Sequence, residues 1–404
     1  MEMNLKKIDN IHQSKQKILL VLYAMVFLTA FHIASSLYIE SSFVNSAVKQ
    51  LSINKIGTLV GLVYATASFI TLITLIHIPK ILRKIGNFRI SIYVVFIEIL
   101  SLLGLIVLQS PIFLILMFII HSIMSSLFIF NLDLFLENFS QNKNTGALRG
   151  IVLTSYSVAF VLAPFLAGFI LTDGDFWKLF FVSALVMVPV LLLLYFQFRN
   201  YKDPIYDNVP FFKTLKEIQQ RKNIYKIMMS SFLLKFFYSW MIIYTPIYLY
   251  QEMNIPMSQI LGIITPIMLL PFIFSGIPLG KIADKILGEK EILTIGFLVM
   301  GISTMSLSFV TSSSLLVWTL LLFLTRIGAS CVEMMTETYF YKKIDATDTH
   351  LIGFFKTLIP LAYLVGPLVA TVFLGYFEYK FLFMALGIIM LTGTRHSLTL
   401  RDTL

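Results

Sequence analysis

The two halves of this chain repeat one another. Residues 150–168 superpose on residues 353–371, and the prolines Pro164 and Pro367 fall at the same place in both segments. Further matching pairs lie about 202 residues apart, at Trp177 and Tyr379, Lys178 and Lys380, and Gly86 and Gly288. Self-similarity over such a long period marks a duplicated architecture. The chain is therefore predicted to fold as two similar halves.

The composition places both halves in a membrane. Hydrophobic residues make up 58% of the chain and charged residues 13%, with a mean hydropathy of +0.86. A soluble core of this length cannot bury so much apolar surface, so lipid must solvate part of it. Since a spanning helix needs ~20 apolar residues, we predict an all-α integral membrane protein with twelve transmembrane helices in two six-helix, pseudo-symmetric bundles. The predicted spans are 18–39, 56–78, 90–109, 112–134, 149–172, 178–198, 224–250, 258–279, 291–311, 314–336, 351–376 and 380–394.

The basic residues predict the orientation. Lys and Arg are retained on the cytoplasmic side of a membrane, and most of the 31 in this chain fall on one side if the N-terminus lies inside. The prediction is a multi-pass protein of the cell membrane with both termini in the cytoplasm. This asymmetry, together with anionic lipid at the inner surface, accounts for the net charge of +10 without a nucleic-acid partner.

The predicted domains are an N-terminal six-helix bundle (1–198), a cytoplasmic linker (199–223) and a C-terminal six-helix bundle (224–404). The linker can form an amphipathic helix on the inner leaflet, since Phe211, Phe212, Leu215 and Ile218 share a helical face. The single cysteine, Cys331, excludes an internal disulfide and a multi-Cys metal site. We expect a monomer in contact with membrane lipid, with no cofactor and no metal.

One loop carries a family resemblance. Between the eighth and ninth spans the chain reads Gly280-Lys-Ile-Ala-Asp284-Lys285-Ile-Leu-Gly288. With the six-plus-six spans and the central linker, this loop resembles the signature of the major facilitator superfamily, from which it departs by one inserted residue. The equivalent loop in the first half has Arg83 where the Asp belongs. The resemblance covers nearly the whole chain and implies two bundles that rock about a central site.

The same resemblance implies a cytoplasmic gate. Asp284 and Lys285 would meet Arg149 and the start of the fifth span across the two halves, where a carboxylate can cap a helix N-terminus or pair with arginine. The alternative is a solvated turn with a local charge pair. Three more acids approach the same end and are interpreted either as gate residues or as ion pairs at helix ends: Asp133, Glu137 and Glu337.

Two proline motifs are interpreted as sites of helix bending. Ala163-Pro164 and Gly366-Pro367 resemble the Gly-Pro signature of the drug:proton antiporter branch of the superfamily. Proline removes a backbone hydrogen bond, and small residues let helices approach closely. Because the motif occurs in both halves, it favours general bending over a device specific to antiport.

Ionisable residues inside the spans are the candidates for chemistry, because they are costly in lipid unless paired or facing water. In the superfamily, spans 1, 4, 7 and 10 line the central cavity. The substrate-cavity candidates on those spans are His32, Asn131, Lys235, Tyr238, Trp240, Tyr244, Arg326 and Ser330. The proton-coupling candidates are Glu333, Glu98 and His32. Structural alternatives remain for each: a buried Arg326–Glu333 bridge, a neutral Glu98, a hydrogen-bonded His32 and aromatic packing on span 7.

Three function classes stay open on these residues. The first is a secondary active transporter of a small molecule, coupled to protons and working by rocker-switch alternating access, with import and efflux both allowed. The second is a non-transporting member of the fold that acts as a sensor or assembly partner. The third, a membrane-embedded enzyme, is disfavoured because His121 and His350 have no partner at metal-ligand spacing in the sequence.

Overall fold

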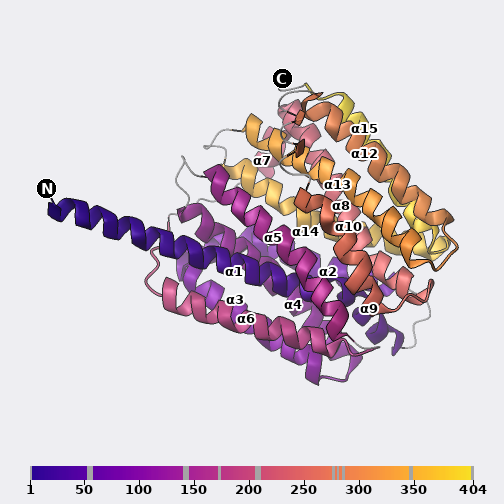
Figure 1. Cartoon of the computed structure of the whole chain (residues 1–404), viewed down its shortest axis with the longest axis horizontal. Coiled ribbons are helices and arrows are strands. Elements are labelled where there is room, and N and C mark those ends of the chain that lie inside the picture. Colours follow the sequence, from indigo (N-terminus) through magenta and orange to yellow (C-terminus); the bar gives the residue numbers. More distant parts are fainter. Residues whose placement is uncertain are drawn as a thin grey trace.

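The structure is a computed structural model of the whole chain. It describes residues 2–51, 58–139, 145–171, 174–204, 211–274, 278–279, 282–283, 287–344 and 349–401. These residues form helices and no strand. Twelve of the helices found among them are long and apolar enough to cross a membrane. The predicted all-α membrane fold is confirmed (Figure 1).

The helices follow the predicted order. Those of the first half are α1 (Glu2–Lys49), α2 (Thr58–Ile85), α3 (Asn87–Val107), α4 (Pro111–Phe139), α5 (Thr145–Ile170) and α6 (Trp177–Phe198). A short helix, α7 (Phe211–Gln220), precedes the second half. The second half contains α8 (Lys222–Gln251), α9 (Met257–Gln259), the π-helix η1 (Ile260–Ile264), α10 (Thr265–Phe274), α12 (Gly288–Ser306), the 3₁₀-helix η3 (Leu307–Phe309), α13 (Leu315–Lys343), α14 (Thr349–Tyr376) and α15 (Phe381–Leu398).

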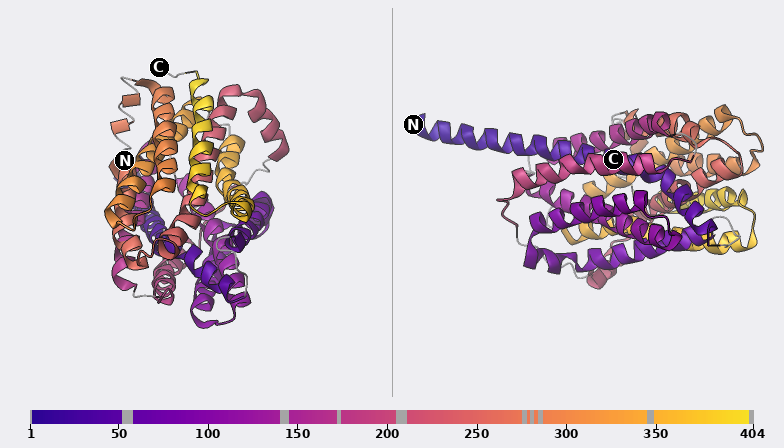
Figure 2. Two further views of the ribbon diagram at one scale, coloured as in Figure 1. Left: turned by 90° about the vertical axis from the view of Figure 1, so that its right-hand side faces the viewer. Right: turned by 90° about the horizontal axis from the view of Figure 1, so that it is seen from below.

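The first span is longer than predicted. It runs from Lys17 to Lys49 instead of ending near residue 39, and the N-terminal part of α1 projects beyond the bundle (Figure 2). The added turns are polar but buried, since Ser41, Ser42 and Asn45 are at most 2% exposed. Protein, not lipid, surrounds these turns, and hydropathy therefore places the end of the helix too early.

The duplication is visible in the contacts between the halves. Helix α2 packs against α14, and α5 packs against η1 and α10. Gly61 on α2 lies against Thr371 of α14, whereas Gly168 on α5 lies against Gly262 of η1. A Cβ atom built on Gly168 would lie 2.5 Å from the backbone nitrogen of Gly262. Because Gly61 and Gly262 occupy matching places in the two halves, as do Gly168 and Thr371, the two contacts are symmetry-related.

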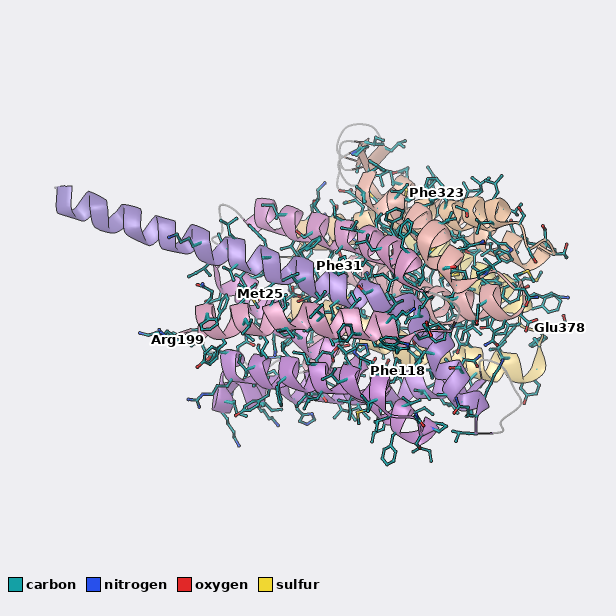
Figure 3. All side chains as sticks on the ribbon, turned by 60° about the horizontal axis from the view of Figure 1, so that its bottom comes forward. Met25, Phe31, Phe118, Arg199, Phe323 and Glu378 are labelled. Carbon is teal, nitrogen blue, oxygen red and sulfur yellow. The ribbon has the colours of Figure 1, made fainter. Side chains whose placement is uncertain are left out.

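The two ends of the bundle differ in how the halves pack. We call the end where α1 begins and α15 ends the termini end, and the opposite end the loop end; Arg199 and Glu378 mark them in Figure 3. One apolar core joins the second half to the loop end of the first half, including Tyr38 and Phe180. A separate core, including Phe135 and Phe198, belongs to the termini end of the first half alone. The apolar core is thus continuous between the halves at the loop end and divided at the termini end.

Helix α7 lies in the predicted linker and packs against α8 and α14. Its Thr214 and Ile218 are at most 2% exposed, and Glu217 Oε2 lies 2.8 Å from His350 Nε2 of α14. Part of its apolar face therefore contacts the protein instead of lipid. Phe211 and Phe212, also on the predicted membrane face, have side chains outside the described part of the structure.

Candidate functional site

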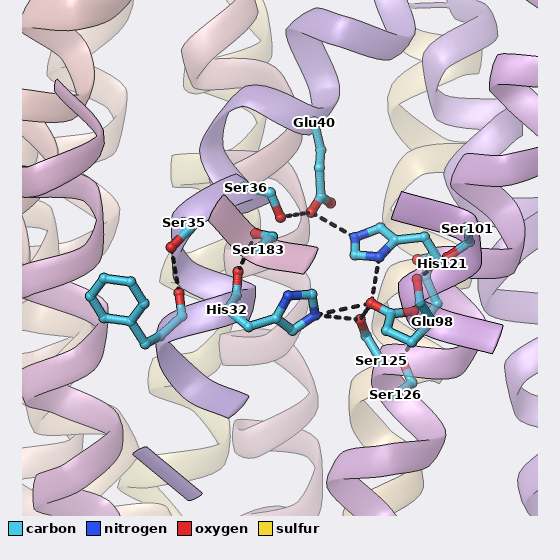
Figure 4. A network of polar contacts seen from close by, with 12 residues as sticks. His32, Ser35, Ser36, Glu40, Glu98, Ser101, His121, Ser125, Ser126 and Ser183 are labelled. Carbon is cyan, nitrogen blue, oxygen red and sulfur yellow. Dashed lines mark hydrogen bonds and ion pairs between the residues drawn. The ribbon is translucent and has the colours of Figure 1, made fainter. Parts of the chain in front are cut away.

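A buried polar network lies inside the first half. On α1, His32, Ser36 and Glu40 recur every four residues, so they share one face of the helix. Glu98 of α3 and His121 of α4 reach that face (Figure 4). The exposed fractions are 1% for His32, 0% for Glu98 and 3% for His121. Such residues are costly inside a membrane protein unless they satisfy one another.

Glu98 Oε1 is the centre of this network. His121 Nδ1 lies 2.6 Å from it and His32 Nε2 lies 2.9 Å from it. Ser125 Oγ donates to the same oxygen at 2.8 Å. On the far side of the imidazole ring, His121 Nε2 lies 3.2 Å from Glu40 Oε1. Both ring nitrogens of His121 therefore face a carboxylate oxygen (Figure 4).

The hydrogen bonds of the network require an additional proton. His121 and His32 make three N···O contacts with Glu98 and Glu40. Two neutral imidazoles supply only two N–H groups, and a carboxylate supplies none. The third hydrogen bond needs one more proton, either on His121 as an imidazolium or on one carboxyl group. The network between helices α1, α3 and α4 therefore holds one more proton than two neutral imidazoles and two carboxylates would.

The same residues could hold a metal ion by their chemistry. Ligand atoms of His32, Glu98 and His121 lie within 4.8 Å of one another, and His32 Nδ1 and Glu98 Oε2 are buried without a hydrogen-bond partner in the part of the chain that the structure describes. The sequence shows no partner for His121 at metal-ligand spacing, but in the folded chain His32 and Glu98 lie beside it. Its partners come from two other helices, which spacing along the chain does not reveal.

A second polar cluster lies in the second half. Lys235 Nζ of α8 lies 2.7 Å from Glu333 Oε1 of α13, and Tyr238 Oη donates to Glu333 Oε2 at 3.2 Å. The structure therefore gives Glu333 an ion pair with Lys235, whereas the sequence led us to consider Arg326. The guanidinium of Arg326 instead lies over aromatic rings, 5.1 Å from the centroid of Phe237 and 5.9 Å from that of Tyr238.

Arg326 lines a small cavity where the two halves meet. Tyr38 of α1 forms one wall, and α8, η1, α10 and α13 form the rest. The π-helix η1 contributes to this wall, and Thr265 Oγ1 donates to the carbonyl of Ile260 at 2.8 Å within it. Apart from Arg326, the lining residues are uncharged. π-Helical turns inserted in α-helices are frequent at functional sites.

Other predicted cavity residues are engaged in packing. Trp240 Nε1 donates to the carbonyl of Gly366 at 2.7 Å, and Tyr244 Oη donates to that of Pro367 at 3.3 Å. Both aromatic side chains are at most 1% exposed. Ser330 Oγ donates within α13 to the carbonyl of Ile327. These contacts give the α8 aromatics a role in joining α8 to α14.

The predicted gate lies partly outside the described residues. Asp284 and Lys285 are not described, nor is the side chain of Arg149. Asp133 of α4 pairs with Lys356 of α14, with Oδ2 and Nζ 2.6 Å apart, at the termini end. This ion pair joins the two halves.

The remaining predicted residues are placed as follows. Glu137 is exposed near the end of α4, and Glu337 is half-buried on α13. Asn131 is fully buried, and neither atom of its side-chain amide has a hydrogen-bond partner within the described ranges. Pro164 and Pro367 lie inside α5 and α14.

Sequence reasoning missed Glu40 and Tyr38. Glu40 falls outside the predicted first span, 18–39, although the four-residue spacing of His32, Ser36 and Glu40 is a usable signal. Tyr38 carried no such signal, because a single tyrosine in an apolar run is ordinary packing. Its place beside Arg326 follows from the contact of α1 with α8.

The fold is that of a membrane protein built from two similar helical halves. The family model of the Major Facilitator Superfamily matches residues 34–346 and 257–398. The chain belongs to that superfamily. No curated protein matches the sequence.

Solved structures share the fold at low sequence identity. A POT family transporter in complex with a thioalcohol-conjugated peptide superposes with a TM-score of 0.77 at 14% identity, covering 94% of this chain and 95% of that one. The nucleoside transporter NupG gives 0.71 at 15% identity, covering 95% and 99%. A bacterial homolog of the human lysosomal transporter Spinster, inward-facing and unoccupied, gives 0.67 at 13%, covering 95% and 93%.

Proposed function

We propose that this chain is a proton-coupled secondary transporter that moves a small molecule by alternating access between its two halves. The observation that carries the proposal is the position of His121 between Glu98 and Glu40. Removing the stored proton would leave two carboxylates around a neutral ring in an interior of low dielectric constant. A conformational change that admits water to one side would therefore change proton occupancy.

Proton binding has a structural connection to the other half. Glu40 of the network and Tyr38 of the Arg326 cavity both lie on α1. Protonation in the first half and occupancy of a site at the interface are therefore proposed to influence each other through α1.

The packing of the two halves supports alternating access. An apolar core joins them at the loop end and is divided at the termini end, as expected of a state that is closed on one side. We propose that Asp133 with Lys356 belongs to the gate at the termini end, together with Asp284, Lys285, Arg149, Glu137 and Glu337. We propose that the chain crosses the cell membrane and that its termini end faces the cytoplasm.

The substrate is proposed to be a small molecule that binds between the halves. NupG is described as a nucleoside transporter, and the POT family structures contain a conjugated peptide or 5-aminolevulinic acid. These relatives support the size class of the substrate. The cavity lined by Tyr38 and Arg326, with Lys235, Tyr238 and Glu333 nearby, is the proposed place of binding.

The experiment is a flux assay on purified protein in liposomes. A ligand is first selected by the rise in melting temperature that it causes across a panel of metabolites and drugs. The native chain should accumulate or expel this ligand when a pH gradient is applied. The variant Glu98→Gln keeps the shape of the side chain but removes its charge. It should lose gradient-driven accumulation and retain substrate exchange, since exchange needs no net proton movement.

The control is Glu378→Gln, which makes the same chemical change at an exposed residue of the loop end. This variant should behave as the native chain does. Full gradient-driven accumulation by Glu98→Gln would contradict the assignment of the coupling site to the His121 network and would make Glu333 the next residue to test.

A further inference from the structure

Arg326 is a buried cation with no carboxylate at ion-pair distance among the described residues. Its side chain is 2% exposed, and its Nη1 atom has no hydrogen-bond partner among the described residues. The nearby cation Lys235 differs, because Glu333 pairs with it at 2.7 Å. An uncompensated buried charge is costly. Residues of this kind inside membrane proteins mark sites for ions or substrates.

The surroundings of Arg326 explain how the protein tolerates the charge. The faces of Phe237 and Tyr238 lie toward the guanidinium at 5.1 and 5.9 Å, and a ring face attracts a cation. These rings cannot accept the in-plane hydrogen bonds of the guanidinium N–H groups. The contact therefore stabilises the charge and leaves Nη1 without an acceptor.

The cavity beside Arg326 defines the rest of a ligand. Most of its walls are apolar, with Met241, Leu249 and Leu322 among them. Its two threonine hydroxyls already have acceptors: Thr245 Oγ1 donates to Met241 Sδ at 3.5 Å, and Thr265 Oγ1 donates to the carbonyl of Ile260 at 2.8 Å. In this form the cavity has room for about one water-sized group. Walls of this composition suit a ligand with an apolar body and one anionic group once the two halves move apart.

We propose that the Arg326 cavity binds a carboxylate with a hydrocarbon or aromatic body, and that such monocarboxylates are the substrate class of this transporter. The planar guanidinium matches a carboxylate by paired hydrogen bonds, which an ammonium cannot reproduce. The carboxylate supplies the acceptor that Nη1 lacks and neutralises Arg326. Its role as substrate rests on the proposed transport function, whereas its binding does not.

Binding is measured first, on detergent-purified native chain without any pH gradient. The probes are hexanoate, benzoate and dodecanoate, with hexanol and hexylamine as controls of similar shape but different charge. Each carboxylate should raise the melting temperature, and the two controls should not. If dodecanoate raises the melting temperature most, the natural ligand is a long-chain carboxylate that enters from the membrane. If hexanoate or benzoate raises it most, the natural ligand is a water-soluble carboxylate. Equal effects of hexanol and hexanoate would overturn the inference without any variant.

The variants then locate the site. Arg326→Gln should weaken hexanoate binding at least tenfold, and Arg326→Lys should weaken it less, because it keeps the charge and loses the paired geometry. Lys380→Gln removes the same charge at an exposed position of the loop end and should bind as the native chain does. Unchanged affinity in folded Arg326→Gln would overturn the inference. If Arg326→Gln does not fold, Arg326→Lys decides: native affinity for both hexanoate and benzoate would contradict a paired contact.

These experiments can contradict the proposed binding site and the proposed transport function independently. If carboxylates bind through Arg326 and a pH gradient moves none of them in liposomes, the cavity assignment holds and the proposed function is wrong. If a gradient moves another ligand while carboxylates do not bind, the proposed function holds and the inference is wrong.

Discussion

Lys49 Nζ donates a hydrogen bond to Gln251 Oε1 at 3.0 Å, and the two residues are 202 positions apart. This separation is the spacing of the internal repeat, so they occupy equivalent places in the two halves. Equivalent residues of a two-fold arrangement contact each other only near the axis that relates them. The Lys49–Gln251 pair therefore marks where the pseudo-symmetry axis leaves the loop end.

The first prediction concerns a reversible cross-link between Lys49 and Gln251. In a background where Ser replaces Cys331, the chain's single cysteine, Lys49→Cys and Gln251→Cys can be joined by a short reagent with a reducible spacer. Linking should abolish flux because the loop end can no longer open, and reduction should restore it. Flux is measured in liposomes before and after reduction. Full flux in the linked protein would mean that the loop end does not open during transport.

The second prediction concerns the glycine contact between α5 and η1. In Gly168→Ala, the new Cβ lies 2.5 Å from the backbone nitrogen of Gly262, so the helices must separate. We expect a loss of about 1–3 kcal/mol, the usual cost of overpacking, measured as a lower melting temperature. Gly375→Ala is the matched control, since nothing lies within 4 Å of its Cβ position. This control should be neutral or stabilising by up to about 1 kcal/mol. Equal effects of both substitutions would contradict the close approach.

The third prediction tests the ion pair at the termini end. Asp133→Asn removes the partner of Lys356 and should favour opening of that end by up to about 1 kcal/mol, because the pair is partly exposed. Labelling of cysteines introduced along α14 reports the change. The exchanged pair Asp133→Lys with Lys356→Asp should restore native labelling. Failure of the exchange to restore it would show that Asp133 acts through another contact.

The fourth prediction separates Lys235 from Arg326. Since Lys235 and Glu333 neutralise each other, removing either charge leaves the other without its ion-pair partner, and removing both does not. A double-mutant cycle of Lys235→Gln and Glu333→Gln should give a coupling energy of about 2 kcal/mol in thermal or chemical unfolding. Arg326→Gln combined with Glu333→Gln should give a smaller coupling energy, because these two side chains are linked through Tyr238 and not by an ion pair in the described structure. Equal coupling energies in the two cycles would mean that Glu333 interacts with Arg326 as strongly as with Lys235, which would contradict the assigned ion pair.

The fifth prediction concerns metal at the His121 network. Three hydrogen bonds already meet at Glu98 Oε1, from His32 Nε2, His121 Nδ1 and Ser125 Oγ, so protons, not a cation, should hold the cluster together. Chelator should leave gradient-driven flux unchanged, and Co²⁺ should give no visible absorption bands of a bound ion. Bands that disappear in His121→Gln would assign the cluster to a metal.

The twelve spans follow from the sequence because lipid imposes length and hydropathy directly on each helix. Three spans end well beyond their predicted limits, at Lys49, Ile85 and Lys343, and the largest difference, at the end of α1, is instructive. Ser41, Ser42 and Asn45 are buried by neighbouring helices, and hydropathy measured along one segment does not include neighbours. Glu40 was lost for the same reason.

The candidate residues were identified individually, but their partners were not. His32 and Glu98 were candidates for coupling, and the structure brings them together with His121 across three helices. The distance between such residues along the chain carries no information about helix packing. For Glu333 the sequence offered Arg326 on the same helix, whereas the partner, Lys235, came from α8.

Tyr38 and Glu40 lie on nearly opposite faces of α1, about 200° apart at 100° per residue. Glu40 contacts the proton store of the first half, and Tyr38 closes the cavity beside Arg326. In the proposed mechanism, a rotation of α1 about its own axis that separated Glu40 from His121 would also move Tyr38 away from the cavity wall. The order of proton release and substrate movement would then depend on the stiffness of this one helix, and a glycine placed between the two residues would uncouple the two events.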